Sequence, residues 1–595
     1  MKQIKLKVNH LIRGTNTSYI NQYLKTLGIN KINSFINQPD ETDEENPFNL
    51  IHMSEAIQIA HEILSQPSKI FIQVDADCDG YTSAAILINY IKRRYPSTII
   101  NWRLHNGKEH GVIVNTVPED TQLVFIPDAG SNQFEEQKQL TDKNIPIIIL
   151  DHHEISDHNK LATTSAIIVN NQISPQCSNK SLSGAGVVYK FIKAIDKTYF
   201  NNNHIFHDYG DLAAIGIIAD AMNMTTLDNN YIAYWGLSHI HNRFIHELAI
   251  KQDRGIKDPN HLTKIDVAFY IAPVINGVIR SGSAEDKELL FKAMINNDDT
   301  QLYEHTWRGT TKMETLWEHA ARNSINAKSR QDAAKKKAFE WLCEKIRAEG
   351  WDKHNIIIAT LNAKESIKVS PNLTGLIAME LVKEFNKPTL VLRDTEFEEQ
   401  HMYGGSGRNG NFYGLPDLKG MLNDAGGYYQ EGHANAFGTF LLPTQIDDIR
   451  NYFDTHLNST VFIDVVYEVD YWFHTGEIID YDMLYEIASY NELWGNSIPQ
   501  PKFAIDLNYT ADEIRVMGAD NSSLKISHDG VDFVAFKCKD LIAQLQAQSQ
   551  GHITIIGRPQ LNEWMGRKKV QVMIDDIEVS NAQNAAATIT INDLI

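Results

Sequence analysis

Asp151, His152 and His153 are the residues of this chain whose types and spacing most suggest chemistry. They end an apolar run, IPIIIL at residues 145–150, which contains no charged residue. Such a run is typical of a strand buried on both faces, and an Asp followed by two His residues at its end is hard to explain as packing. Carboxylate and imidazole groups are ligands suited to divalent metals such as Mn²⁺ or Mg²⁺.

The same arrangement occurs twice upstream. The strand-like run KIFIQV at residues 69–74 is followed by Asp75, Asp77 and Asp79, and the run LVFI at residues 123–126 is followed closely by Asp128. Helical patterns lie between the runs, so the strands should be parallel and joined by crossover helices. Because the carboxyl ends of parallel strands share one edge of the sheet, we expect these side chains to meet in one crevice.

A further aspartate, Asp220, lies in the nearly continuous apolar segment at residues 208–224. We expect it in the middle of a helix, where a bare carboxylate would cost several kcal/mol. A metal ion would compensate for this cost, and so would a helix N-terminus or an Arg partner. Any single Asp in these segments is also explained as a helix cap or turn residue, but that explanation does not extend to all four segments in this order.

The composition is that of an ordinary globular protein, since the 595 residues are 43% hydrophobic and 22% charged. No apolar run approaches the about 18 residues of a membrane span, and the N-terminus does not resemble a signal peptide. The four cysteines lack CxxC spacing, which is typical of free thiols in a reducing cytosol. The net charge of -20 argues against a general polyanion-coating protein but not against a local basic track or bound metals. We therefore expect a cytoplasmic protein with no membrane partner.

The pattern along the chain predicts five segments. They are an N-terminal extension (residues 1–50), an α/β catalytic domain (51–300), a connecting helix (301–350), a second, smaller α/β domain (351–460) and a C-terminal β domain (461–595). The connecting segment is predicted to be one long charged helix from residue 311 onward, with its basic stretch at 328–337 as a solvated helix face. The C-terminal part alternates in the manner of strands, which is consistent with a small β-barrel.

A glycine-rich run, GGSGRNG at residues 404–410, matches the spacing G-x-G-x-x-G. No regular helix is expected to begin there and no acidic partner follows about 20 residues later in a βαβ unit, so a dinucleotide fingerprint is disfavoured. We expect a phosphate nest, in which Ser406 and backbone N–H groups hold an oxygen and Arg408 supplies charge. A tight structural turn is the alternative.

Together these motifs resemble those of the DHH phosphoesterases, and their order resembles the RecJ-type single-strand exonucleases in particular. The matching segments are DADCDG (75–80) with Thr82 and Ser83, Asp128, the triplet 151–153, Asp220, PVINGVIR (273–280), SGR (406–408), GH (432–433), LWGN (493–496) and NEWMGR (562–567). The resemblance covers roughly residues 50–580. The N-terminal part departs from the bacterial housekeeping form, which favours a phage or mobile-element member.

The resemblance implies a fold and a metal site. The fold is a parallel-sheet DHH domain, a long connecting helix, a DHH-associated α/β domain and an OB-fold. The implied cofactors are two divalent ions, Mn²⁺ in preference or Mg²⁺, and the implied ligands are Asp75, Asp77, Asp128, His152 and Asp220, with Asp128 as the bridge. Two such metals clamp a phosphodiester, lower the pKa of a bridging water and neutralise the leaving oxygen. We assign His153 to the scissile phosphate or to orienting a ligand, and Asp79 to orienting a ligand or starting the helix near Thr82.

Substrate contacts are also implied, with alternatives left open. The expected substrate-binding residues are Asn276, Arg280, Ser406, Arg408, Gly432 and His433. Arg280 could instead form an ion pair at a domain interface, and His433 could be an ordinary loop residue. Weaker nucleic-acid contacts are expected at Lys108, His110, Trp564, Arg567 and Lys568. For the last three, a charged hairpin of the barrel is almost as good an explanation.

The implied function is metal-dependent 5′-to-3′ exonucleolytic hydrolysis of single-stranded DNA in recombination, repair or replication, with the polarity implied by the resemblance alone. The expected partners are single-stranded DNA and a single-strand-binding protein or a helicase, and we expect a monomer. One alternative is a short-oligonucleotide or nucleotide phosphoesterase of the same superfamily, which would not need the OB-fold. Another is a non-catalytic DNA-binding replication scaffold, which the intact acids disfavour.

Overall fold

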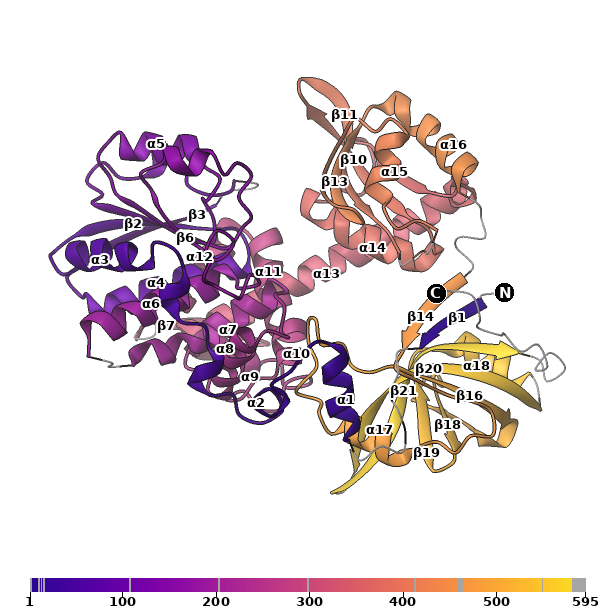
Figure 1. Cartoon of the computed structure of the whole chain (residues 1–595). Helices are drawn as coiled ribbons and strands as arrows, with labels where there is room; N and C mark the ends of the chain where they lie inside the picture. Colours follow the sequence, from indigo (N-terminus) through magenta and orange to yellow (C-terminus); the bar gives the residue numbers. More distant parts are fainter. Residues whose placement is uncertain are drawn as a thin grey trace. The chain divides into compact units, whose positions relative to one another are not determined.

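The structure is a computed structural model. It describes residues 3–580, except residues 9–10, 12, 14–16, 106–108, 202–203, 297–298, 411, 413, 458–463, 548 and 565. The chain forms two compact units. One unit consists of residues 27–331 and 492–499, and the other of residues 1–26, 332–491 and 500–595. Figure 1 shows the elements of both units.

A five-stranded parallel sheet is the centre of the first unit. Its strand order is β3-β2-β4-β5-β6, and every neighbouring pair is parallel. The strands are β2 (Lys69–Val74), β3 (Ile99–Leu104), β4 (Leu123–Pro127), β5 (Ile147–Asp151) and β6 (Ile167–Asn170). The predicted parallel sheet is therefore confirmed, and the three strands that end in candidate residues, β2, β4 and β5, are direct neighbours.

The other elements of this unit are mainly helices. They are α2 (Ile32–Ile36), α3 (Met53–Leu64), α4 (Cys78–Arg94), α5 (Phe134–Thr141), α6 (Gly184–Tyr199), α7 (Gly210–Ala219), α8 (Leu227–Ser238), α9 (Arg243–Ile250), α10 (Lys264–Asp266), α11 (Ala272–Ser281) and α12 (Ala284–Ile295). Among the described residues, no helix combines the length and the apolar character needed to span a bilayer.

Side chains of β4 explain why this strand is apolar throughout. Val124 and Ile126 belong to a core cluster with Leu140 of the following helix, α5. Phe125 alternates to the other face, where its ring lies 6.0 Å from that of Phe191 in helix α6. Helices thus pack on both faces of the strand, which is the arrangement that a continuous apolar run predicts.

The connecting segment differs from the predicted single helix. A two-stranded antiparallel hairpin, β7 (Leu302–Trp307) and β8 (Thr310–Thr315), precedes α13 (Leu316–Ala348). The hairpin turn contains Gly309, whose φ of 82° lies in the left-handed region that glycine favours. Threonines in β8 are β-branched and suit a strand better than a helix. The prediction of a helix from residue 311 was therefore wrong by five residues, while α13 itself is long, as expected.

Lys264, at the start of α10, is a buried cation in the first unit, with an exposed fraction of 8%. Its Nζ donates a hydrogen bond to Oδ1 of Asn230 at 3.0 Å. Burial lowers the pKa of Lys264 from its ordinary value of 10.5 to about 8. The charged form therefore destabilises the folded chain relative to the unfolded chain.

We expect the substitution Lys264→Met to raise the melting temperature at pH 7, because up to about 3 kcal/mol of unfavourable charge burial is removed. Between pH 8 and 10.5 the unfolded wild-type chain holds this proton while the folded chain does not, so wild-type stability rises with pH. The advantage of the variant should shrink over that range. Thermal unfolding of both proteins at pH 7 and pH 10 measures this, and a pH-independent difference would contradict the prediction.

The second unit contains a smaller α/β part built on another five-stranded sheet. The strand order is β12-β13-β11-β10-β9, with β9 and β10 parallel and the other pairs antiparallel. Its elements are β9 (Ile357–Leu361), α14 (Thr374–Phe385), β10 (Thr389–Phe397), β11 (Gln400–Arg408), α15 (Leu418–Asp424), β12 (Tyr429–His433), β13 (Ala436–Leu441) and α16 (Ile446–His456).

The C-terminal part of the second unit is a seven-stranded sheet with the order β15-β16-β20-β21-β19-β18-β17. Its elements are β15 (Tyr471–Phe473), α17 (Tyr481–Ala488), β16 (Phe503–Thr510), β17 (Ile514–Met517), β18 (Ser523–His528), β19 (Val531–Ala535), α18 (Lys539–Gln546), β20 (Gln550–Trp564) and β21 (Arg567–Ser580). The alternating pattern of the sequence predicted this β-rich region.

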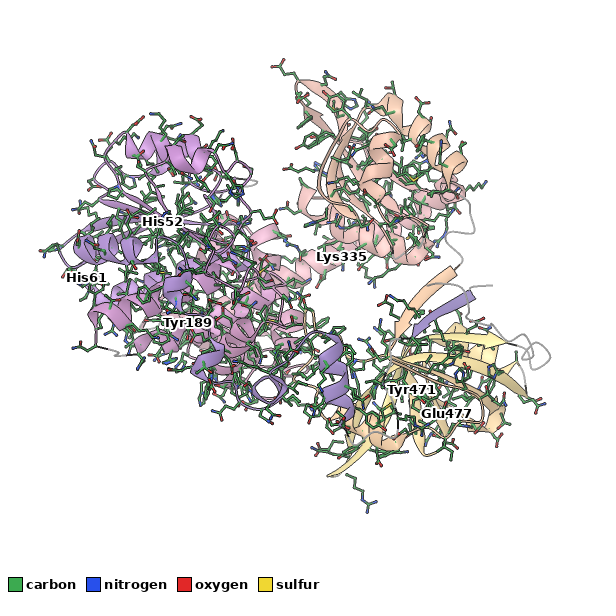
Figure 2. All side chains as sticks on the ribbon, viewed as in Figure 1. His52, His61, Tyr189, Lys335, Tyr471 and Glu477 are labelled. Atoms are coloured by element: carbon green, nitrogen blue, oxygen red, sulfur yellow. The ribbon has the colours of Figure 1, made fainter. Side chains whose placement is uncertain are left out.

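The start of the chain belongs to the same unit as its end. Strand β1 (Gln3–Val8) pairs in parallel with β14 (Asp464–Val469), and α1 (Tyr19–Thr26) follows it. Arg13 forms an ion pair with Glu477. Glu477 also accepts a hydrogen bond from the hydroxyl of Tyr471 at 2.8 Å, and both of these residues are labelled in Figure 2. The expected extension at residues 1–50 is thus divided between the two units after Thr26.

Candidate metal centre

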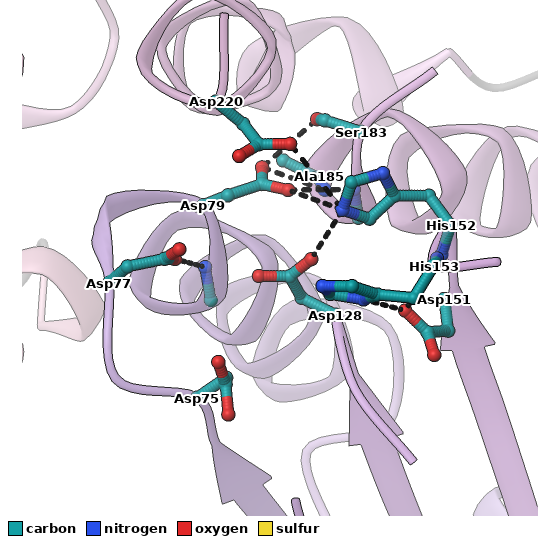
Figure 3. Close-up of polar contacts among 12 residues, drawn as sticks. Asp75, Asp77, Asp79, Asp128, Asp151, His152, His153, Ser183, Ala185 and Asp220 are labelled. Atoms are coloured by element: carbon teal, nitrogen blue, oxygen red, sulfur yellow. Dashed lines mark hydrogen bonds and ion pairs between the residues drawn. The ribbon is translucent and has the colours of Figure 1, made fainter. Parts of the chain in front are cut away.

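The ends of β2, β4 and β5, the start of α4 and the end of α7 bring two groups of candidate ligands together (Figure 3). In the first group, which we call the Asp75 cluster, ligand atoms of three carboxylates lie within 4.8 Å of one another. In the second, the Asp220 cluster, two carboxylates and an imidazole meet the same limit. The Asp75 cluster is Asp75, Asp77 and Asp128, and the Asp220 cluster is Asp79, His152 and Asp220. All five predicted ligands therefore lie in one place.

His152 and Asp128 connect the two clusters. Nε2 of His152 lies 3.2 Å from Oδ1 of Asp128 and 3.5 Å from Oδ2 of Asp220. A third group of possible ligands, Asp128, His152 and His153, also lies within 4.8 Å. Asp128 thus belongs to more than one group, which is the property that a bridging carboxylate requires.

Asp77 has two roles in the local structure. Its side chain accepts a hydrogen bond from the N–H of Gly80 at 2.9 Å and caps helix α4. The helix therefore begins at Cys78, whereas the sequence analysis predicted a start near Thr82. The cap explanation and the ligand explanation of this Asp are compatible, because one oxygen can cap the helix while the other faces the cluster.

Asp79 points at the start of another helix, α6. Its carboxylate accepts hydrogen bonds from Oγ of Ser183 at 2.9 Å and from the N–H groups of Gly184 and Ala185 at 2.7 and 3.1 Å. A carboxylate at a helix N-terminus is favoured by the free N–H groups and by the helix dipole. Asp79 thereby links α4 to α6 directly beside the clusters. Of the two roles expected for Asp79, the geometry favours orienting a ligand over starting helix α4.

Asp128 occupies a strained backbone position. Its φ of 62° lies in the left-handed region, which Asp tolerates better than most residues. Gly184 makes room for it, since a Cβ on Gly184 would lie 2.3 Å from Oδ1 and 2.5 Å from Cβ of Asp128. Strain of this kind is held in place by the surrounding structure and is common at functional sites.

Asp151 does not face the clusters but holds His153. Its Oδ1 lies 2.7 Å from Nδ1 of His153 and accepts the N–H of His152, while Oδ2 accepts the N–H of Ser131. Burial alone would raise the pKa of Asp151, but the hydrogen bond and positive charge of His153 outweigh it and the pKa lies well below its ordinary value. The same hydrogen bond raises the pKa of His153 to about 9.

Asp220 lies at a helix end and not in mid-helix as predicted. Helix α7 ends at Ala219, and Asp220 is its C-cap. Ala221 follows with a φ of 55°, in the left-handed conformation that often ends helices. Little in the sequence indicates this end, because the left-handed position carries Ala where Gly is usual.

Burial and repulsion between carboxylates shift the pKa values of three of the acids upward. Burial and the charge of Asp79 raise the pKa of Asp77 to about 6 and that of Asp220 to about 7. Burial, with the charges of Asp79 and Asp77, also raises the pKa of Asp128 well above its ordinary value. Burial lowers the pKa of His152, which favours the neutral imidazole that can bind a metal.

The donor set fits divalent cations of the harder kind. Oδ1 of Asp128 is buried and accepts no hydrogen bond from the described residues. Such an oxygen is costly unless something else compensates for it. A cation beside the clusters would do so and would also relieve the repulsion between the acids. Carboxylate oxygens with a single imidazole suit Mn²⁺ or Mg²⁺ rather than structural zinc, which favours thiolates.

His110 approaches the Asp75 cluster from outside. Its Nδ1 lies 2.9 Å from Oδ1 of Asp75, and its ring lies 5.9 Å from that of His153. This hydrogen bond raises the pKa of His110. The structure thus places His110, a weak nucleic-acid candidate, at the edge of the site, while Lys108 lies outside the described residues.

Known proteins are similar to this chain in sequence and in fold. A model described as DHH family, N-terminal domain, matches residues 69–217, and a model described as RecJ OB domain matches residues 474–576. A Bacillus subtilis (strain 168) chain named as an SPbeta prophage-derived single-strand DNA-specific exonuclease, YorK, is 31% identical over 93% of this chain and 95% of its own length. This chain belongs to the RecJ-like family of DHH proteins.

Further relatives agree with this assignment. The single-stranded-DNA-specific exonuclease RecJ of Bacillus subtilis is 27% identical over 91% of this chain and 65% of its own length. The crystal structure of Thermus thermophilus RecJ in complex with Mn²⁺ superimposes with a TM-score of 0.71 at 18% identity, covering 97% of this chain and 80% of that one. The expected DHH and OB-fold architecture of the RecJ-like chain is confirmed.

Asn276 and Arg280 of the RecJ-like chain lie on α11, next to the Asp75 cluster. Oδ1 of Asn276 accepts the N–H of Cys78 at 3.1 Å, so this side chain fixes the loop between β2 and α4. The positive charge of Arg280 lowers the pKa of Asp77, which opposes the upward effect of burial. Arg280 is an exposed residue, and its positive charge acts on Asp77 of the Asp75 cluster.

The glycine-rich run is a strand and not a nest or a turn, so that prediction was wrong. Residues 404–408 lie in β11, which pairs with β10 on one side and β13 on the other. The glycines are needed because neighbours approach closely: a Cβ on Gly405 would lie 1.9 Å from the carbonyl oxygen of Val391. Its backbone groups serve the sheet and are not available as a nest.

Ser406 and Arg408 nevertheless converge on a different anion-binding feature, the N-terminus of α14. Oγ of Ser406 lies 2.9 Å from Oγ1 of Thr374, the first residue of that helix. Nη2 of Arg408 lies 2.5 Å from the position that a Cβ on Gly375 would take. A hydroxyl pair, a guanidinium and a helix N-terminus together can bind a phosphate group.

Gly432 and His433 lie at the end of β12, in the same sheet. His433 is in register with Ala436, and Ala436 with Arg408, so His433 lies two strands from Arg408 in the same row. Gly432 has a φ of 123°, and a Cβ there would lie 2.9 Å from the carbonyl oxygen of Ala436. His433 is exposed and is the last residue of strand β12, so it is not the loop residue of the alternative explanation.

The weak candidates in the C-terminal sheet lie at one hairpin. Trp564 pairs with Arg567 across the turn between β20 and β21, but the side chain of Trp564 lies outside the described part. Lys568 lies across from Glu563, with Nζ 4.0 Å from a carboxylate oxygen. The charged-hairpin explanation accounts for this pair.

Sequence reasoning did not assign the roles of three residues at these sites. Gly184 packs on Asp128, Asp151 orients His153, and Thr374 meets Ser406. Only Asp151 had a usable signal, because it is part of the same triplet as the two histidines. The other two come from helices whose starts cannot be placed beside a strand end without the fold.

Proposed function

We propose that this chain is a divalent-metal-dependent exonuclease that hydrolyses single-stranded DNA from the 5′ end. One observation carries the proposal: the Asp75 and Asp220 clusters, in each of which the ligand atoms lie within 4.8 Å, lie next to each other. Relatives named as single-strand DNA-specific exonucleases support the choice of substrate. The polarity rests on the resemblance to RecJ.

The two clusters divide the proposed metal ligands. Asp75, Asp77 and Asp128 would hold one Mn²⁺ or Mg²⁺ ion, His152 and Asp220 would hold the other, and Asp128 would bridge them. When bound, such a pair of ions polarises the phosphodiester, supplies hydroxide at neutral pH and stabilises the leaving oxygen.

Residues around the ligands would position the reacting phosphate. His153 has a pKa of about 9, so it is protonated at neutral pH, and its side chain is about half exposed. It can donate a hydrogen bond to a phosphate oxygen while Asp151 fixes its ring. Asp79 would act as a positioning residue through its bonds to the start of α6. Arg280 would bind the substrate. Asn276 would fix the loop before α4.

A phosphate anchor would make the cleavage exonucleolytic. Ser406, Arg408 and Thr374 would bind the terminal phosphate of the strand, with His433 at the edge of this anchor. We further propose that the chain acts as a monomer in the cytoplasm, in DNA recombination, repair or replication. A single-strand-binding protein or a helicase would present the strand.

Digestion of end-labelled DNA with Mn²⁺ tests the proposal. A long single strand labelled at its 5′ end should release labelled mononucleotides or short products first, whereas a 3′ label should remain on long fragments until late. Release from the 3′ end first would refute the polarity. Cleavage of dinucleotides only would favour the short-oligonucleotide phosphoesterase, and binding without cleavage would favour the scaffold.

Arg408→Ala should reduce the preference for a 5′-phosphate over a 5′-hydroxyl end by about tenfold, since a charge-assisted contact to phosphate is lost. Initial rates on the two substrates measure this preference. Arg347→Ala is a matched control, because Arg347 is an exposed Arg of the same unit that pairs with Glu384. An equal loss of rate on the 5′-phosphate and 5′-hydroxyl substrates in the Arg408 variant would refute the proposal that Arg408 anchors the terminal phosphate.

A further inference from the structure

A segment from the C-terminal half of the chain reaches the metal centre. Residues 492–499 group with the first unit, although the residues before and after them belong to the second. We propose that Asn496 in this segment is a positioning residue for Asp220. The inference rests on the proposed metal-dependent function and adds a part of the chain that lies 276 residues beyond the ligand.

Asp220 needs such support because it is the C-cap of helix α7, directly after the last helical residue. Its N–H donates to the carbonyl of Gly216 at 3.0 Å, and the N–H of Met222 donates to that of Ile217 at 3.1 Å. These bonds form the usual ending of a helix, with Ala221 in the left-handed conformation. For a residue with a Cβ that conformation costs roughly 1–2 kcal/mol, so the ending is prone to fray unless something holds it.

The side chain of Asn496 stabilises this helix end by hydrogen bonding. Its Nδ2 donates to the carbonyl oxygen of Ala221 and, at 3.0 Å, to that of Met222. On the other side of the turn, the N–H of Asn223 donates to Oγ of Ser181 at 2.9 Å. Side chains therefore fix the turn from both sides, and one of the two contacts comes from residues 492–499.

The segment itself is anchored well enough to act as a support. Leu493, Trp494 and Ile498 are buried. Gly495 and Ile498 exchange two backbone hydrogen bonds of 3.1 Å, which close a tight turn that carries Asn496 at its tip. The apolar anchors hold the turn, and the exposed Asn side chain makes the specific contact.

Loss of this contact should act on the metal rather than on the fold. If the helix end frays, the carboxylate of Asp220 is the first candidate ligand to move, because Asp220 is the C-cap of that helix. The ligands of the Asp75 cluster come from strand ends and from the start of α4, so they should stay in place. Partners that orient metal ligands typically affect metal affinity by about 10- to 100-fold.

The test is a Mn²⁺ titration of the full chain, with free Mn²⁺ measured by electron paramagnetic resonance and with no DNA present. We expect Asn496→Ala and the nearly isosteric Asn496→Asp to weaken one Mn²⁺ site about tenfold and to leave the other site unchanged. Asn496 is exposed, so both variants should fold, and thermal unfolding checks this. Asn355→Ala is the control, because Nδ2 of Asn355 also donates to a backbone carbonyl, that of Leu457, in the other unit.

A second readout separates positioning from general damage. In DNA hydrolysis, the Asn496 variants should need about tenfold more Mn²⁺ for half-maximal rate, but saturating Mn²⁺ should restore the wild-type kcat and leave KM for DNA unchanged. Unchanged Mn²⁺ titrations in both variants would overturn the inference while the proposed function stands. Weakened Mn²⁺ binding in a protein whose wild type does not cleave DNA would overturn the proposed function while the positioning role stands.

Discussion

Asp128→Asn should lower the rate of Mn²⁺-dependent hydrolysis by about a thousandfold, since the carboxylate that we propose as the bridge would contribute several kcal/mol of transition-state stabilisation through the metals. Asn is the informative replacement because, like Asp, it tolerates the left-handed backbone that this position has. It keeps the shape of the side chain and removes the charge.

Three measurements distinguish this effect from damage to the fold. Single-strand binding should be retained, Mn²⁺ binding should weaken, and the melting temperature in a chelator should not fall. The last expectation follows because the substitution removes the buried charge of Asp128, whose pKa is raised by burial and by the neighbouring carboxylates Asp79 and Asp77. Turnover close to that of the wild type would refute the role of Asp128.

Gly184→Ala should lower the turnover by about a hundredfold, although residue 184 offers no side chain to the reaction. The added Cβ would lie 2.5 Å from Cβ of Asp128. The backbone fixes the position of that Cβ, so a change of rotamer cannot relieve the clash. Either the end of β4 or the start of α6 must move, and a displacement near 1 Å can cost about 100-fold in rate. Mn²⁺ binding should weaken as well.

Gly236→Ala is the matched control. It is also a helical glycine of the same unit, and its Cβ would lie 2.1 Å from the carbonyl oxygen of Gly210. This variant should lose stability through a backbone clash, but at temperatures below its unfolding it should bind Mn²⁺ as the wild type does. Equal Mn²⁺ binding in the two variants would show that Gly184 matters only for stability.

The parts of the fold that could be predicted are those with strong apolar periodicity. The predicted strand at residues 69–74 has the same bounds as β2. The convergence of the acids followed from one topological rule, namely that parallel strands end at the same edge. That rule needs only the order of the elements, which the sequence contains.

The errors occurred where local chemistry was ambiguous. A run of glycines is typical of a turn, but in β11 the glycines let neighbouring strands and rings approach. Asp220 was placed in mid-helix because Ala221 gives no sign of a left-handed residue. The contact of Thr374 with Ser406 and the contact of Asn496 with Ala221 could not be predicted, although Asn496 belongs to the matching segment 493–496, since each contact joins segments that are far apart in the chain.

The pairing of β1 with β14 has a consequence for synthesis of the chain. Gln3 aligns with Asp464, so the first strand leaves the ribosome long before its partner is made. At about 5–20 residues per second, the wait is roughly 20–90 s. A nascent edge strand is prone to mispairing, and lysines such as those at positions 5 and 7 are a common protection against it. An N-terminal fusion partner would therefore be expected to change the yield of correctly folded protein more than a C-terminal one.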